Sequence, residues 1–90
     1  MNWQIDFHSR ALKFLKKNKI SEEEIVEVIK KVIKKFQGEK INIDVAKLKG
    51  EWLGFHRIKI GKLRIIAEFN FDKKRIYIEV IDWRGKAYKK

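Results

Sequence analysis

The chain has 90 residues, of which 23 are lysine or arginine, 12 are aspartate or glutamate, and none is cysteine. Without cysteine there is no disulfide framework and no thiolate metal site, and two histidines give little support for a zinc site. The start MNWQIDFHSR has no basic leader before an apolar core, and no apolar run is long enough to cross a membrane. The composition predicts one soluble, cytoplasmic domain over residues 1–90, with no metal ion and no membrane contact.

The net charge is +11, with an isoelectric point near 10.0. Residues 1–45 carry 10 basic and 7 acidic side chains, a net charge of +3, whereas residues 46–90 carry 13 and 5, a net charge of +8. An excess of this kind fits a polyanionic partner such as a nucleic acid or a ribonucleoprotein. A solvated, lysine-rich surface of the thermophile type is the competing interpretation.

The first elements expected are a strand and a helix. Residues 3–7 alternate between apolar and polar side chains, which predicts a short strand that can join a sheet. Ser9 offers a cap to a helix over residues 10–17, where apolar residues recur at helical spacing and lysines occupy the last turn. Asn18 ends this pattern.

A second helix begins at Ser21, which forms a capping box with Glu24. Glu27 lies one turn before Lys31, so the lysines of this helix are interpreted as a solvated face. Residues 39–53 are predicted to be a connector. An apolar stripe runs along the helix to its predicted stop at Gly38: Ile25, Val28, Ile29, Val32, Ile33 and Phe36.

Residues 55–88 predict three strands, because β-branched and aromatic residues dominate and turn residues interrupt them at 61–62 and 72–74. Strict alternation gives each strand one apolar face, and in the third strand it places Ile78 and Val80 together. The other face of the sheet collects Arg57, Lys59 and Arg64, and function is expected there. The predicted fold is α+β: an N-terminal strand, two helices and an antiparallel three-stranded meander, with the helices on one sheet face.

The usual catalytic motifs are missing from the sequence. There is no glycine-rich phosphate loop, no serine elbow and no cysteine nucleophile, and no cofactor is expected. His56 shares a predicted face with isoleucines, which favours a satisfied, partly buried histidine, and His8 is interpreted as structural. Glu68 and Glu79 are interpreted as cross-strand partners of basic residues.

What remains is a set of cations and aromatic residues on the predicted strands and at their ends. The cations could converge on a phosphodiester and stabilise the charge that develops during its cleavage, although many RNA-binding proteins that cut nothing have a similar composition. Arginine suits bidentate phosphate contact and lysine supplies a point charge. Tyr88 and Trp83 are candidates to stack on a base. The candidate cations are Arg57, Lys59, Arg64, Arg84 and Lys86.

The runs LKGEWLGFHRIKIGKLRIIAEF and IYIEVIDWRGKAY resemble the RelE/ParE superfamily of toxins from toxin–antitoxin modules. The run DFHSRALKFLKK is similar to the first strand and helix of that family, so the likeness spans nearly the whole chain. On this likeness the chain resembles an archaeal RelE, and the basic pair on the first strand of the meander favours the RelE branch. The resemblance implies one RelE-like domain that enters the ribosomal aminoacyl site and cuts messenger RNA, with the RNA's own 2′-hydroxyl attacking the adjacent phosphate.

The resemblance also implies roles for five residues. Arg57 and Lys59 help to draw the proton from the 2′-hydroxyl, Arg64 and Arg84 hold the charge of the phosphorane-like transition state, and Tyr88 stacks on the target base. The implied partners are the ribosome, its messenger RNA and a cognate RelB-like antitoxin, in a heterodimer or heterotetramer. Two alternatives stay open: a ParE-like inhibitor of DNA gyrase, and a nucleic-acid-binding module without catalytic activity.

Overall fold

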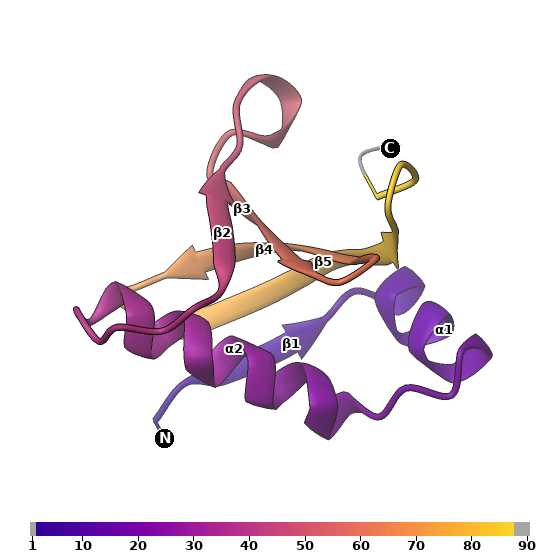
Figure 1. Cartoon of the computed structure of the whole chain (residues 1–90), viewed down its shortest axis with the longest axis horizontal. Helices are drawn as coiled ribbons and strands as arrows, with labels where there is room; N and C mark the ends of the chain where they lie inside the picture. Colours follow the sequence, from indigo (N-terminus) through magenta and orange to yellow (C-terminus); the bar gives the residue numbers. More distant parts are fainter. Residues whose placement is uncertain (1, 88–90) are drawn as a thin grey trace.

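The computed structural model describes residues 2–87, which form a five-stranded sheet with two helices on one face (Figure 1). The strand order in the sheet is β1-β5-β4-β3-β2. The predicted α+β fold, with its N-terminal strand, two helices and three-stranded meander, is confirmed. The strands are β1 Gln4–Phe7, β2 Asp44–Lys47, β3 Phe55–Ile60, β4 Leu63–Asn70 and β5 Arg75–Trp83, and the helices are α1 Ser9–Lys17, α2 Glu22–Phe36 and the short 3-10 helix η1 Gly50–Trp52.

The sheet differs from the prediction at both edges. At one edge β1 pairs with β5 in parallel, so the sheet is mixed and not wholly antiparallel. At the other edge β2 pairs antiparallel with β3, inside the segment predicted to be a connector. β2 has only four residues, DVAK, and so short an edge strand is recognisable only by its partner.

The helices begin at well-defined caps. Nδ1 of His8 accepts a hydrogen bond of 3.0 Å from the N–H of Arg10, so His8 caps α1, and the predicted cap, Ser9, is instead the first helical residue. The predicted capping box of α2 is present: Ser21 Oγ accepts from the N–H of Glu24 at 3.2 Å, and the Glu24 carboxylate accepts from the N–H of Ser21 at 3.0 Å. Within residues 2–87, neither helix is long and apolar enough to cross a membrane.

The main core lies between the helices and the sheet. The apolar stripe of α2 supplies one half of it, and alternate residues of β3, β4 and β5 supply the other. Each isoleucine that leaves water in this way stabilises the fold by about 1.5–3 kcal/mol. Its largest side chains are exposed by less than 2 %: Ile25, Ile29, Val32, Ile58, Ile65, Ile76 and Ile78.

A β-bulge in β5 gives the sheet a second core. Val80 pairs with Ile66 of β4, while Ile78 pairs with the next residue of β4, so Glu79 is an extra residue in the register. The bulge reverses the alternation, because Ile81 joins the main core and Val80 packs on the opposite face. The prediction that Val80 shares a face with Ile78 is therefore wrong.

We call the sheet face opposite α1 and α2 the open face. Figure 1 shows η1 and the C-terminal turn on this side of the sheet. Four buried residues form the second core there, namely Trp52 of η1, Ile66, Val80 and Ala87 of the C-terminal turn. The open face is therefore part apolar, and not the wholly polar surface expected.

Candidate nucleic-acid interface

Three of the predicted site residues lie side by side on the open face. Arg57 and Lys59 are two residues apart on β3, so their side chains leave the same face of the sheet. Lys59 is directly opposite Arg64 of β4. Opposed residues on antiparallel strands have Cβ atoms about 5 Å apart. The pairing therefore brings three cations together without any contribution from the loops.

Arg64 is the one charged residue among residues 2–87 that is buried, with 8 % of its surface exposed. Its Nη1 donates hydrogen bonds to the carbonyls of Gly61 at 2.7 Å and Leu63 at 3.0 Å. The β3–β4 turn thus fixes the guanidinium through a single nitrogen. Within the described chain no hydrogen bond occupies Nε or Nη2, the pair of donors suited to a bidentate phosphate contact.

Asp44 of β2 holds the other two cations. Its Oδ1 accepts a hydrogen bond of 2.8 Å from Nη2 of Arg57, and its Oδ2 lies 3.9 Å from Nζ of Lys59. The Arg57 side chain is only 17 % exposed, and its buried Nε has no hydrogen-bond partner in residues 2–87. Asp44 was missed in the sequence because it lies in the predicted connector.

The C-terminal candidates follow β5. The N–H of Arg84 donates to the carbonyl of Lys62 at 2.8 Å, which ties this residue to the same turn that binds Arg64. The chain reverses at Gly85, whose φ of +86° suits glycine, and then buries Ala87 in the second core. Tyr88, the predicted stacking residue, lies outside the described residues.

We call the cations around the β3–β4 turn the basic end of the open face. Two carboxylates lie among them: Asp44, and Asp82 of β5, which is directly opposite Arg64. Six cations and two carboxylates give this area a net charge of +4. Its positive potential attracts polyanions. The basic end comprises Arg57, Lys59, Lys62, Arg64, Arg84 and Lys86.

The other end of the open face carries no such excess. Two acidic residues, Asp6 and Glu68, and two basic residues, Lys73 and Arg75, line a groove there. Their charges cancel. On the described open face, the excess of positive charge therefore lies at the end where β3 turns into β4.

Glu68 and Glu79 are not the cross-strand partners predicted from the sequence. Glu68 lies opposite Phe55 and Tyr77, and no ion pair joins it to another described residue. Glu79, the bulge residue, binds Nη2 of Arg10 at 3.1 Å, and its Oε2 lies 3.6 Å from Nε2 of His8. These contacts join α1 to β5.

His56 lies on the helix side of the sheet, away from the basic end. Its ring contacts Phe36 and Phe69, with centroids 5.3 and 5.4 Å away. Burial, with a smaller contribution from the charge of Lys47, lowers the pKa of His56 below its ordinary value. The predicted partial burial is confirmed, but the residue is not satisfied, because Nδ1 has no hydrogen-bond partner within the described chain.

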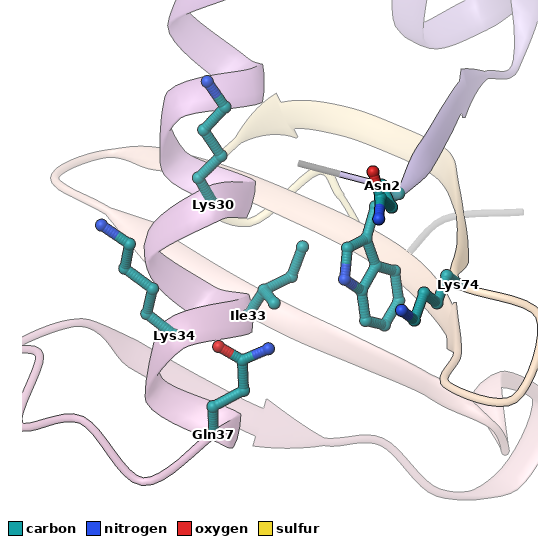
Figure 2. A pocket seen from close by; sticks show the side chains of 7 residues that line it. Asn2, Lys30, Ile33, Lys34, Gln37 and Lys74 are labelled. Atoms are coloured by element: carbon teal, nitrogen blue, oxygen red, sulfur yellow. The ribbon is translucent and has the colours of Figure 1, made fainter.

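A second concave surface lies between α2, the start of β1 and the β4–β5 turn, with a volume of about 430 Å³. Lys30 and Lys34 also line this groove, and Figure 2 shows Ile33 pointing into it while the amino ends of the two lysines are directed outward. Lys30 also pairs with Glu27 at 3.2 Å. This arrangement agrees with the interpretation of the α2 lysines as a solvated face.

No protein-family model matches the chain, and no curated protein matches its sequence. Solved structures do match it. A chain of the archaeal RelE-RelB complex from Pyrococcus horikoshii OT3 is 24 % identical and gives a TM-score of 0.60, over 97 % of this chain and 100 % of that chain. YafQ from Escherichia coli strain BL21(DE3) gives a TM-score of 0.69 at 11 % identity, over 98 % of this chain and 100 % of that one.

The conserved hypothetical protein HP0892 from Helicobacter pylori is also similar, with a TM-score of 0.66 and 15 % identity over 90 % of this chain and 93 % of that chain. The mixed sheet with both helices on one face is thus the fold of the RelE-like toxins. More particularly, the neighbours include complexes of RelE, YafQ and YoeB with RelB, DinJ and YefM. The predicted resemblance to the RelE/ParE superfamily is confirmed at the level of the fold.

Proposed function

We propose that this chain is the toxin of a type II toxin–antitoxin module and that it cuts messenger RNA in the ribosomal aminoacyl site. The observation that carries the proposal is the basic end of the open face. There Arg57, Lys59 and Arg64 stand in register on two neighbouring strands of a RelE-like sheet. A net charge of +4 in this area suits a substrate made of phosphodiesters.

The cleavage step needs little from the protein beyond position and charge. The 2′-oxygen attacks the adjacent phosphorus, the bond from phosphorus to O5′ breaks, and a cyclic phosphate and a 5′-hydroxyl result. Arg57 and Lys59 ease the loss of the 2′ proton to water by stabilising the alkoxide. Arg64 and Arg84 bind the phosphoryl oxygens as they gain charge, and O5′ takes up a proton as it leaves.

The remaining roles are positioning roles. Asp44 orients Arg57 and Lys59 through contacts of 2.8 and 3.9 Å. Tyr88 stacks on the target base, and the ribosome holds the messenger RNA so that its nucleophile and phosphate are aligned.

A cognate antitoxin is the proposed protein partner. The solved neighbours include complexes of a toxin-fold chain with a second protein, among them RelE-RelB, DinJ-YafQ and YoeB-YefM. We propose that extended or helical segments of the antitoxin cover the basic end and exposed apolar residues of the helix layer, in a heterodimer or heterotetramer. Binding there would block the proposed RNA site.

Primer extension on translating ribosomes tests the function. Wild type should produce cuts inside codons at the aminoacyl site, and the Arg57→Ala/Lys59→Ala variant should lose them. The Lys31→Ala/Lys34→Ala variant removes the same charge from the solvated face of α2 and should cut like wild type.

The proposal fails if folded wild type cuts nothing on ribosomes. A gyrase supercoiling assay then tests the ParE-like alternative, and salt-dependent RNA binding without cleavage would indicate the non-catalytic module.

A further inference from the structure

The two helices differ sharply in their charge. α1 contains four cations, Arg10, Lys13, Lys16 and Lys17, and no carboxylate. α2 contains four glutamates and four lysines. The two helices contain equal numbers of cations, so the difference lies in the carboxylates, which balance the lysines of α2 and are absent from α1. The excess of positive charge is therefore specific to α1, and a partner that neutralises it is expected beside this helix.

Two of these lysines line a groove of about 240 Å³ between α1 and the end of β5. Lys13 and Lys17 are four residues apart, so they lie on the same side of the helix, about 6 Å apart along its axis. Lys86 of the C-terminal turn reaches the groove from the other wall. No carboxylate of residues 2–87 lies within 4.0 Å of any of these three amines.

The other charged groups of the groove leave it basic. Arg10 is neutralised by Glu79, at 3.1 Å, and its Nε also donates to the Glu79 carbonyl at 3.2 Å. Asp82 lines the groove as well, and its Oδ1 accepts a hydrogen bond of 2.7 Å from the N–H of Trp83. Three free lysines against one carboxylate leave a net charge of +2.

The groove is continuous with the basic end of the open face. Asp82, on its wall, is directly opposite Arg64, which is directly opposite Lys59. Neighbouring strands are about 4.8 Å apart, so this row spans about 10 Å from β5 to β3. Lys86 belongs to both surfaces, and a strand that leaves the basic end over β5 therefore meets α1 next.

We propose that Lys13 and Lys17 of α1, with Lys86, bind the phosphate backbone of the RNA strand beyond the cleavage position. The inference rests on the proposed function, because it extends the path of the same RNA. Flexible lysines with free amines suit phosphates as point charges, whereas the cores of protein interfaces are depleted in lysine. RNA is therefore favoured over an acidic protein as the occupant.

The test compares two double variants that each remove two exposed positive charges from one helix. Lys13→Gln/Lys17→Gln removes them from the α1 groove, and Lys31→Gln/Lys34→Gln removes them from α2. The probe is a short single-stranded RNA with every 2′-hydroxyl methylated, so that it cannot be cut by its own nucleophile. Its affinity is measured across a range of salt concentrations.

Each phosphate contact on a single strand contributes about 0.7 to the slope of log affinity against log salt. The α1 variant should lose about 1.4 from the slope, which corresponds to roughly 25-fold weaker binding at about 0.1 M salt, while the α2 variant keeps the slope of wild type. On ribosomes the α1 variant should raise KM and leave kcat unchanged.

Equal slopes for the two variants would overturn the inference. So would an unchanged RNA slope together with weaker binding of a poly-glutamate peptide by the α1 variant, which would assign the groove to an acidic protein. Cleavage by wild type is scored separately. If wild type cuts RNA and the two variants do not differ, only the proposed α1 contact is refuted. If wild type cuts nothing, the proposed function is refuted.

Discussion

Neutralising Asp44 should strengthen the binding of RNA while weakening the fold. Asp44→Asn removes the one carboxylate within 4.0 Å of Arg57 and Lys59 in the described chain. The Asp44 side chain is 55 % exposed, so solvent screens the pair and its contribution to stability is about 0.5–1 kcal/mol. For a domain of this size, that loss lowers Tm by about 2–8 °C.

The gain in affinity follows from counting charges. A negative charge beside two cations cancels about one phosphate contact, so its removal should steepen the salt dependence by about 0.7 and tighten RNA binding about fivefold near 0.1 M salt. The assay is titration of the methylated RNA described above, with urea unfolding of the same variant to measure the fraction folded.

Asp72→Asn is the matched control for this substitution. Asp72 is an exposed carboxylate at the β4–β5 turn, without an ion pair to any of residues 2–87. It carries the same charge at the other end of the open face. The reasoning is refuted if Asp44→Asn binds RNA no more tightly than wild type, or if Asp72→Asn tightens binding by the same factor.

Three further substitutions test the fold around the site. Arg64→Ala should lower the free energy of unfolding by about 2–3 kcal/mol in urea titration, because two charged hydrogen bonds to carbonyls are lost from a buried position. His56→Phe should remove a pH dependence. The pKa of folded His56 lies below its unfolded value of 6.5, so wild type should lose stability relative to the variant as pH falls from above 6.5 through the lowered pKa, in urea titrations at several pH values. Trp52→Ala should cost about 3–5 kcal/mol by emptying the second core, measured by thermal unfolding.

Two of these predictions have a neighbouring residue that serves as a control. Arg84→Ala, at an exposed residue, should leave stability within about 0.5 kcal/mol of wild type, so a loss of cleavage there reports chemistry and not unfolding. Leu53→Ala changes a residue that is 76 % exposed beside Trp52, and a cost as large as that of Trp52→Ala would contradict the second core. A wild type that gains stability over His56→Phe on acidification would contradict the pKa argument.

The elements that the sequence predicts well are those with their own local signals. The capping box at Ser21 and the stripe from Ile25 to Phe36 specify α2 without help from the rest of the chain. The same holds for β3 and β4, whose alternation and turn at residues 61–62 fix the register that brings Lys59 opposite Arg64. For this reason three of the proposed cations could be placed together in advance.

The features that escaped prediction depend on partners far away in the chain. β2 exists because four residues pair with β3, and the position of Asp44 beside Arg57 follows only from that pairing. The bulge at Glu79 is invisible in the alternation of β5, yet it decides which face receives Val80 and Ile81. The second core needs η1 and the C-terminal turn to meet across the sheet, which no local pattern records.

The place of β5 in the sheet also governs when the basic end of the open face can assemble. β5 lies between β1 and β4, yet it is synthesised after every other described strand. Until it emerges, β1 has no partner in the sheet, and the main core lacks Ile76 and Ile78. Asp82, near the end of β5, and Arg84, just after it, are synthesised after Ile76 and Ile78. A partly synthesised copy that lacks β5 therefore has no assembled basic end.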